Sequence, residues 1–152
     1  MYKRQVLETG ETLIESGAIL DYLDEIAGPD RALVPRAGVA RRKALRTLAA
    51  ATAACDKAIA ITYERRRPSD KVSTDWIVRC RVQLDAALSE LESSGLELSG
   101  SRRLTQVDIT TACMCGYVQR VEPDALSAAR YPSLSQLSTT CEARSEFAAC
   151  RQ

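Results

Sequence analysis

The amino-acid sequence predicts a mostly α-helical protein, in which a short β-hairpin and one helix precede an all-helical bundle. Two features of the composition favour helices: alanine and leucine are abundant, and the 152 residues include only 7 Gly and 5 Pro. Three long segments also repeat their apolar residues at helical spacing. A chain of this length can bury a hydrophobic core of its own.

The charged residues nearly balance, with 21 Lys and Arg against 20 Asp and Glu and a formal net charge of +1. Because the basic residues are spread along the chain, we expect no nucleic-acid partner. No apolar stretch has the length of a membrane span or the pattern of a signal peptide, so we expect a cytoplasmic protein with no membrane partner. The cysteines fall mostly at small or apolar positions of helical patterns and are expected to be reduced core thiols: Cys55, Cys80, Cys113, Cys115, Cys141 and Cys150.

The first 27 residues predict a β-hairpin followed by a helix. Two short β-tolerant runs, residues 3–8 and 11–14, flank Thr9-Gly10, and a glycine between two such runs is a hairpin signal. Apolar residues then repeat at helical spacing behind Ser16, a favoured N-cap residue, so a helix is expected from Ser16 to Ala27. Two strands alone are only marginally stable, and we expect another element to cover them.

Residues 28–38 contain two prolines and two glycines without any periodicity, which indicates a linker. Three long helices are expected beyond it, at residues 39–66, 74–93 and 106–121, with one or two short terminal helices after Pro132. The predicted core side of the first long helix comprises Leu45, Leu48, Thr52, Cys55, Ile59 and Tyr63, and that of the second Trp76, Cys80, Leu84, Leu88 and Leu91. The third helix is apolar around Ile109, Ala112, Cys113 and Gly116, so we expect it to be central.

The run Leu104-Thr105-Gln106-Val107-Asp108-Ile109 has the pattern of a capping box. Thr105 is placed to accept a hydrogen bond from the Asp108 N–H, while the Asp108 carboxylate accepts one from the Thr105 N–H. Leu104 and Ile109 can pack together as a hydrophobic staple. We interpret this motif as the nucleus of a buried helix and not as a functional site.

A possible binding site occurs where the second strand runs into the first helix, at Glu15-Ser16. The N-terminus of a helix offers free N–H groups and a positive dipole, so Ser16 and its neighbouring amides suit a carboxylate. Glu15 beside them suits an ammonium group. Together these two residues would bind the zwitterionic end of an amino acid or γ-glutamyl peptide, although Ser16 is equally suited to serve only as an N-cap and Glu15 to complement the dipole.

Two motifs in this order resemble the glutathione transferase family: Glu-Ser-x-Ala-Ile-x-x-Tyr-Leu at residues 15–23 and Leu-Thr-x-x-Asp-Ile at residues 104–109, separated by a proline-containing linker. The resemblance covers nearly the whole chain. It implies the end of a thioredoxin-like domain at residues 1–27, a linker at 28–38 and the all-helical C-terminal domain at 39–152.

The resemblance also implies a function. Glu15 and Ser16 match the family residues that hold the γ-glutamyl end of glutathione. Glutathione would be the co-substrate, with no other cofactor, and its thiolate would attack a hydrophobic electrophile. The resemblance also implies a homodimer.

Two departures from the family argue for weak or absent activity. The portion of the thioredoxin-like domain that carries the thiol-activating Tyr, Ser or Cys has no counterpart in the sequence, and a thiol at neutral pH is mostly protonated. Arg4-Gln5 also stands where the family has Val-Pro with a cis bond, and a trans bond is expected before a non-proline residue. Two alternatives therefore stay open: a non-catalytic helical module for interaction or dimerisation, and a product whose real start lies upstream of Met1.

The sequence contains three weaker candidates for a functional site. The arginines in the run from Tyr63 to Pro68 could bind an anion, but cations in a last helical turn also complement the dipole. Tyr63 and Trp76 could line a substrate pocket or pack in a core or interface. Cys113 and Cys115 do not predict a metal site, because residues two apart on a helix point in different directions and the chain has no histidine.

Overall fold

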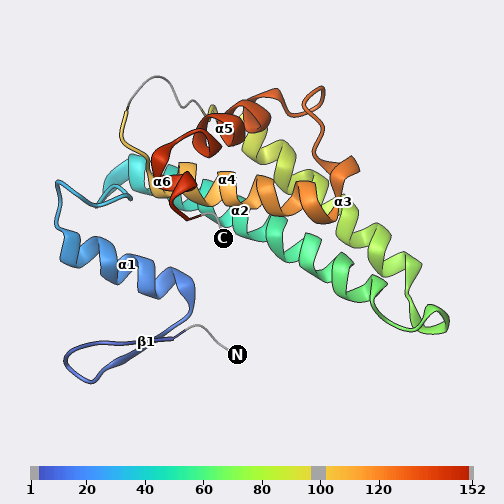
Figure 1. Ribbon diagram of the computed structural model, residues 1–152, viewed down its shortest axis with the longest axis horizontal. Coiled ribbons are helices and arrows are strands. Elements are labelled where there is room, and N and C mark those ends of the chain that lie inside the picture. The colour runs from blue at the N-terminus through green and yellow to red at the C-terminus, as the bar shows by residue number, and fades with distance from the viewer. Residues whose placement is uncertain (1–3, 97–101, 151–152) are drawn as a thin grey trace. The chain divides into compact units, whose positions relative to one another are not determined.

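The computed structural model describes residues 4–96 and 102–150, and it confirms a mostly α-helical protein with a two-stranded antiparallel sheet (Figure 1). The strands are β1 (Arg4–Val6) and β2 (Thr12–Ile14), and the helices are α1 (Ser16–Ala27), α2 (Gly38–Arg65), α3 (Thr74–Ser93), α4 (Gln106–Val121), α5 (Pro132–Glu142) and α6 (Ser145–Ala148). Two 3-10 turns that the sequence pattern does not predict are η1 (Ser69–Lys71) and η2 (Pro123–Ala125). The chain forms two compact units, residues 1–42 and 43–152.

The strands β1 and β2 form the predicted hairpin, in which Gln5 lies opposite Leu13. Gly10 in the turn has a φ of 83°, a conformation that glycine adopts without steric cost. Lys3, the first residue of the predicted first run, lies outside the described residues. Among the described residues no peptide bond is cis, so the bond between Arg4 and Gln5 is trans, as predicted. Helix α1 contacts both strands and is therefore the element that covers them.

Asp24 ties the linker to α1 within the first unit. Its carboxylate accepts hydrogen bonds from the N–H groups of Leu33 at 2.8 Å and Val34 at 2.9 Å. Arg41, in the first turns of α2, donates to the Asp21 carboxylate at 3.1 Å. These contacts hold the linker and the start of α2 against α1. Glu15 and Ser16 lie at the opposite end of α1.

The buried side of α2 differs from the predicted one. Leu45, Thr52 and Tyr63 are predicted to face the core but are exposed. The apolar residues of α2 that are fully buried are Ala51, Ala54, Ala58 and Ile61. A prediction based on the size of apolar side chains selects the wrong side of α2 as the buried one. Small alanines let α2 approach its neighbouring helices closely, so the side that carries them is buried.

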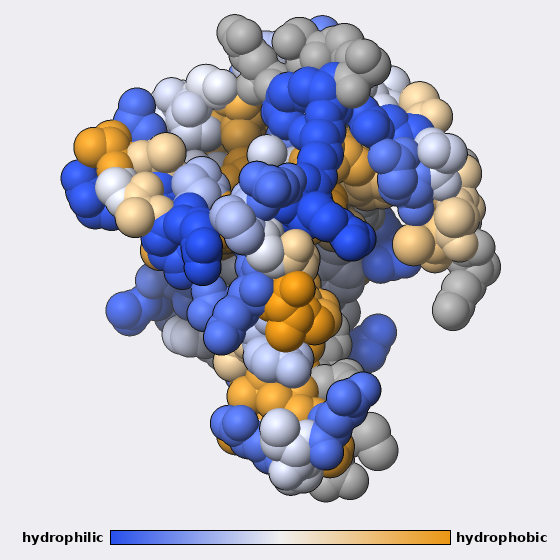
Figure 2. Space-filling model, turned by 90° about the vertical axis from the view of Figure 1, so that its left-hand side faces the viewer, coloured by the Kyte–Doolittle hydropathy of each residue, from blue (hydrophilic) through white to orange (hydrophobic). Residues whose placement is uncertain are grey.

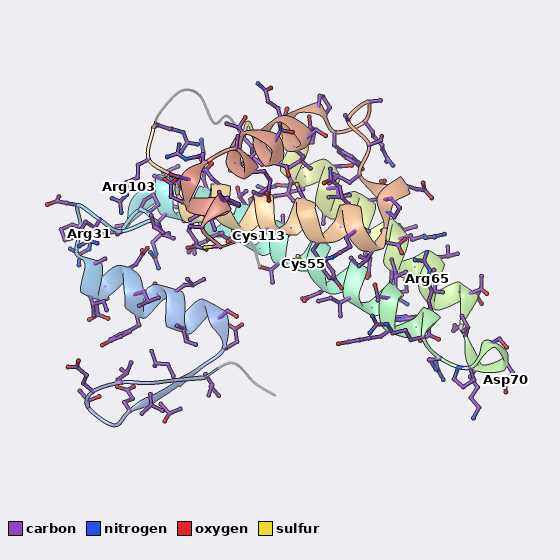
Figure 3. The ribbon with its side chains drawn as sticks, viewed as in Figure 1. Arg31, Cys55, Arg65, Asp70, Arg103 and Cys113 are labelled. Carbon is purple, nitrogen blue, oxygen red and sulfur yellow. The ribbon has the colours of Figure 1, made fainter. Side chains whose placement is uncertain are left out.

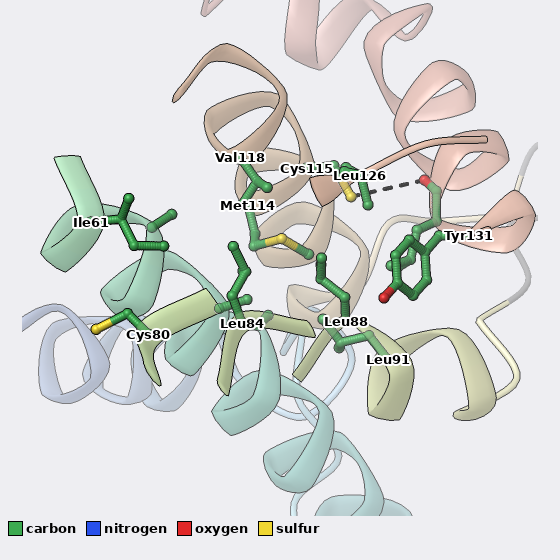
Figure 4. Packing of buried hydrophobic residues seen from close by; sticks show 14 of the residues in the cluster. Ile61, Cys80, Leu84, Leu88, Leu91, Met114, Cys115, Val118, Leu126 and Tyr131 are labelled. Atoms are coloured by element: carbon green, nitrogen blue, oxygen red, sulfur yellow. Dashed lines mark hydrogen bonds between the residues drawn. The ribbon is translucent and has the colours of Figure 1, made fainter. Parts of the chain in front are cut away.

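The predicted side of α3 is largely confirmed. Cys80, Leu84, Leu88 and Leu91 are buried, whereas Trp76 is 42% exposed and Ile77 takes its place in the core. Figure 4 shows Leu84 and Leu88 packed against Met114, Cys115 and Val118 of α4, with Ile61 of α2 at one side and Tyr131 at the other. This cluster is the main core of the second unit.

Helix α4 is central, as predicted, because it contributes to both core clusters of the second unit. The second cluster consists of Leu104, Ala112, Leu137 and Cys141. Cys113 and Gly116, which are predicted to lie in the apolar interior, are exposed. The prediction thus identifies the helix correctly but misplaces its buried side at these two residues.

The capping box at the start of α4 is confirmed. Thr105 Oγ1 accepts a hydrogen bond from the Asp108 N–H at 3.4 Å, and Asp108 Oδ2 accepts one from the Thr105 N–H at 2.7 Å. Leu104 and Ile109 belong to the same apolar cluster, as expected for a staple. Arg102 adds two hydrogen bonds to the Asp108 carboxylate, each of 2.8 Å, which the sequence pattern does not predict.

The six cysteines are all free thiols, but only some occupy the core. Cys80, Cys115 and Cys141 are buried, as predicted, and Cys55 is half-buried. Cys113 and Cys150 are exposed, so the prediction of core thiols is wrong for these two. No helix in the described parts of the chain combines the length and the apolar character needed to cross a bilayer.

Candidate functional site

The candidate site lies at the junction of β2 and α1. Glu15 has φ 77° and ψ 140°, the only positive φ of a non-glycine residue in the described chain, and this conformation turns the strand sharply into the helix. Glu15, and not Ser16, is the N-cap: its Oε2 accepts a hydrogen bond from the Gly17 N–H at 2.7 Å. The predicted capping role of Ser16 is therefore wrong, because Ser16 is already the first residue of the helix.

The Ser16 hydroxyl has no hydrogen-bond partner among the described residues, and its side chain is half-buried. The first N–H groups of an α-helix have no partner within the helix. In α1 the Glu15 carboxylate takes the N–H of Gly17, and the Ile19 N–H bonds to the Glu15 carbonyl. The N–H groups of Ser16 and Ala18 and the Ser16 hydroxyl thus remain as donors for an outside group.

Both candidate side chains are accessible, since Glu15 is exposed and Ser16 is half-buried. One Glu15 carboxylate oxygen is engaged with Gly17, while Oε1 is open to a cation. The junction therefore presents donors and a positive helix dipole beside a single negative charge. This arrangement can bind a ligand that carries a carboxylate and an ammonium group close together.

The arginine-rich end of α2 is occupied by contacts within the protein. Arg65 pairs with the buried Glu122, and Arg67 pairs with Glu64 at 2.8 Å. Arg66 lies over the ring of Tyr63, with 6.0 Å between the guanidinium carbon and the ring centroid. These side chains are not gathered into an anion site.

The two aromatic candidates are both accessible and do not belong to the core of the second unit: Tyr63 is 64% exposed and Trp76 is 42% exposed. Cys113 and Cys115 lie on different sides of α4, one exposed and the other fully buried. Burial raises the pKa of the Cys115 thiol to about 12, with further contributions from nearby acidic groups, so this thiol stays protonated.

The sequence patterns do not reveal two features of α1, one within the site and one at the opposite end of the helix. One is the capping role of Glu15, for which the signal is weak because glutamate is not among the favoured N-cap residues. The other is the pair of hydrogen bonds that Asp24 accepts from the N–H groups of Leu33 and Val34 in the linker. Its only sequence signal is an acidic residue one turn before the Gly28-Pro29 break, a pattern that many surface helices share.

Comparison with known proteins defines the family. No family model matches the sequence, and no curated protein matches it in a sequence comparison. Solved structures do match. A glutathione S-transferase from Methylobacterium radiotolerans, in complex with glutathione sulfonate, is 31% identical with a TM-score of 0.80, over 96% of this chain and 69% of that one.

Two further structures agree. A glutathione transferase family member from Pseudomonas fluorescens Pf-5, with bound S-(propanoic acid)-glutathione, is 29% identical with a TM-score of 0.85, over 97% of this chain and 75% of that one. A glutathione S-transferase from Methylobacillus flagellatus, with glutathione bound, is 25% identical with a TM-score of 0.82, over 96% of this chain and 73% of that one. The fold is thus that of glutathione transferases, and this chain belongs to the glutathione S-transferase family.

Proposed function

We propose that this chain binds glutathione through Glu15 and Ser16, as a glutathione transferase-like protein. The observation that carries the proposal is the accessible junction of β2 and α1, with an unpartnered Ser16 hydroxyl beside the Glu15 carboxylate, in a chain that belongs to this family. The relatives crystallised with glutathione or its derivatives support the same ligand. No cofactor other than this co-substrate is proposed.

The chemistry of the two residues suits the γ-glutamyl end of the tripeptide. Its α-carboxylate would accept hydrogen bonds from the Ser16 hydroxyl and the first N–H groups of α1, where the helix dipole also favours an anion. Its ammonium group would pair with Glu15. Charge-assisted hydrogen bonds of this kind are about twice as strong as neutral ones, so few contacts are needed to orient the ligand.

Glutathione bound in this way would react, as in the family, by attack of its thiolate on a hydrophobic electrophile. Glu15 and Ser16 would hold the end of the tripeptide that is remote from the thiol, and so they orient the thiol without ionising it. Because the protonated thiol is a poor nucleophile, we propose that the 152-residue polypeptide by itself is a weak catalyst.

The rate of conjugation tests this catalytic proposal. Initial rates with glutathione and a chlorodinitrobenzene are expected to exceed the uncatalysed rate only slightly, and Ser16→Ala is expected to remove that excess. A large rate that is unchanged by Ser16→Ala would contradict the proposed role of the junction.

A cytoplasmic location is also proposed, because all six cysteines are free thiols, as is typical of a reducing compartment.

A second candidate function is a non-catalytic interaction module, in particular a homodimer. It is favoured by exposed apolar residues in the first unit: Val6, Ile14, Leu20, Leu23 and Ile26. Figure 2 shows apolar side chains open to solvent among polar ones in the lower part of the view. The hairpin also has no third strand beside it within the described chain, and an open sheet edge favours pairing with another chain. A stable oligomer in size-exclusion chromatography without measurable glutathione binding would favour this function over the first.

A further inference from the structure

The second unit has a cavity of about 440 Å³ between α3 and the η2 turn. Arg81 and Val82 are among the residues of α3 that line it, and Glu122, Asp124 and Ala125 line it at η2. The volume is within the range of about 300–1,000 Å³ that small-molecule sites occupy. All of its lining residues belong to the second unit, whereas the junction of β2 and α1 belongs to the first.

A buried carboxylate fixes Arg81 at the wall of this cavity. Glu122 is only 5% exposed and accepts hydrogen bonds from both Nη groups of Arg65, which Figure 3 labels near the end of α2. Arg81 is the second cation beside this carboxylate, with 3.4 Å between its Nε and Glu122 Oε2. A buried carboxylate needs such partners, because an unpaired charge in the protein interior is costly.

The guanidinium group of Arg81 remains available to a ligand. Its side chain is 54% exposed, and neither of its Nη groups donates a hydrogen bond within the described chain. The end of a guanidinium group presents parallel N–H donors that match the two oxygens of a carboxylate. Glu122 offsets only one of the two positive charges of Arg65 and Arg81, so one positive charge remains at this side of the cavity.

Asp124 supplies a charge of the opposite sign. It is exposed at the cavity, and its carboxylate has no hydrogen bond or ion pair with any described residue. Asp85 also lines the cavity but is already neutralised, since Arg130 pairs with it at 2.5 Å and the Tyr131 hydroxyl donates to it at 2.8 Å. Asp124 is therefore the carboxylate that can bind an ammonium group.

The rest of the wall offers apolar surface. Val82 is 65% exposed, and Leu84 and Ala125 line the same cavity. Leu84 is almost fully buried in the main core that Figure 4 shows, so the cavity reaches the edge of that core. An aliphatic group that covers Val82 would remove apolar surface from water and so favour binding.

We propose that this cavity binds a small α-amino acid with an aliphatic side chain. The ligand carboxylate accepts hydrogen bonds from the Nη groups of Arg81, its ammonium group donates to Asp124, and its side chain packs on Val82. A ligand with only a negative charge is disfavoured by Asp124, and one with only a positive charge by Arg81. The pair of opposite charges therefore selects a zwitterion.

An NMR titration tests this proposal with L-leucine as the probe. The full 152-residue protein, labelled with nitrogen-15, should show saturable shifts of amide signals in residues 81–85 and 122–126. Three compounds each lack one part of the probe: 4-methylpentanoate the ammonium group, 3-methylbutylamine the carboxylate and glycine the side chain. Each should bind at least about tenfold more weakly than leucine. Absence of saturable shifts with leucine in these residues, or equal binding of all four compounds, would overturn the proposal.

Two variants test the two charges. Arg81→Gln and Asp124→Asn should each weaken leucine binding at least about tenfold. Arg79→Gln is the matched control, because Arg79 is an exposed arginine of the same helix that is not among the residues lining the cavity. Arg81→Gln also takes a partner from the buried Glu122, so circular dichroism checks its fold. Asp124→Asn disturbs no ion pair of the described chain, and undiminished leucine binding by this variant would also overturn the proposal.

A further variant separates this site from the glutathione site. Ser16→Ala should leave leucine binding unchanged while it weakens glutathione binding, because Ser16 does not line the cavity. Loss of leucine binding in Ser16→Ala would overturn the assignment of leucine to Arg81 and Asp124. A failure to bind glutathione leaves the leucine result unaffected, so the two proposals are tested independently.

Discussion

Glu15 and Gly17 form the contact that shapes the candidate site. Glu15 Oε2 accepts the hydrogen bond from the Gly17 N–H at 2.7 Å, and a Cβ atom on residue 17 would lie only 2.9 Å from that same oxygen. The absence of a side chain at Gly17 thus leaves room for the carboxylate that caps α1. The same contact fixes one oxygen of Glu15 and leaves the other for a ligand.

Gly17→Ala should therefore displace the Glu15 carboxylate and weaken glutathione binding by several-fold. The loss of the cap costs about 1 kcal/mol, while alanine in place of a helical glycine contributes about 0.5–1 kcal/mol, so the free energy of unfolding should change little. Calorimetric titration with glutathione and thermal unfolding measure the two effects separately.

Gly116→Ala is the matched control for this change. A Cβ on Gly116 meets no atom within 4 Å, and the residue lies in the middle of α4. It should stabilise the protein by about 0.5–1 kcal/mol without any effect on glutathione binding. If Gly17→Ala binds glutathione as tightly as the unchanged protein, the position of Glu15 does not matter for the ligand.

Much of the fold follows from the sequence, because chain breaks and caps are local signals. Gly28-Pro29 ends α1, the Thr105 and Asp108 pair starts α4, and the predicted bounds of these helices agree with the structure. The buried side of α2 is not determined by a local signal. It depends on which neighbours pack against the helix, and alanines give no size signal that distinguishes a close helix contact from an exposed position.

The sequence predicts the candidate site for a different reason. Glu15 and Ser16 follow from their place between a strand and a helix, and from the family motif that they begin. The separate roles of the two residues cannot be predicted from the sequence, because the positive φ of Glu15 and its hydrogen bond to Gly17 depend on how the hairpin enters α1. A glutamate at this position has no intrinsic preference that would reveal its role as N-cap.

The buried alanine side of α2 can be tested by overpacking. Ala54 is fully buried in the main core cluster, so Ala54→Leu should lower the free energy of unfolding by about 1–3 kcal/mol. Thr52→Leu on the exposed side should change it by less than about 0.5 kcal/mol. Urea unfolding of both variants measures these changes, and the opposite order of the two effects would show that the predicted side faces the core after all.

Asp108 is predicted to be the most sensitive polar residue of the second unit. It is 2% exposed, and its carboxylate accepts hydrogen bonds from Arg102, from the Thr105 N–H and from the Thr105 hydroxyl. Asp108→Asn should lower the free energy of unfolding by about 2–4 kcal/mol, because it removes the charge-assisted hydrogen bonds from Arg102 and weakens the capping box. Asp56→Asn, at an exposed position within α2, should have almost no effect in the same urea experiment.

The stability that Asp108 provides should depend on pH. Burial alone would raise the pKa of this carboxyl, but hydrogen bonds from Arg102 and from Thr105 outweigh burial and hold the pKa below its usual value. The folded state therefore binds fewer protons than the unfolded state, so this stability is complete above the unfolded pKa of about 4 and is lost as the pH falls further.

The difference in unfolding free energy between the unchanged protein and Asp108→Asn measures this dependence. That difference should be constant from neutral pH down to about pH 5 and should shrink at lower pH. A difference that grows on acidification would mean that the folded protein raises the pKa of Asp108.

The most direct test of the glutathione site is a calorimetric titration of three proteins with glutathione: the unchanged chain, Ser16→Ala and Ser73→Ala. Ser73 is the N-cap of α3, and its hydroxyl accepts a hydrogen bond from the Trp76 N–H at 3.3 Å, so Ser73→Ala removes a helix-terminal hydroxyl while Glu15 and Ser16 stay unchanged. We predict that the unchanged chain and Ser73→Ala bind glutathione alike and that Ser16→Ala binds it at least about tenfold more weakly, the equivalent of one charge-assisted hydrogen bond. Equal binding by all three proteins, or no binding by the unchanged chain, would contradict the assignment of Glu15 and Ser16 as the glutathione site.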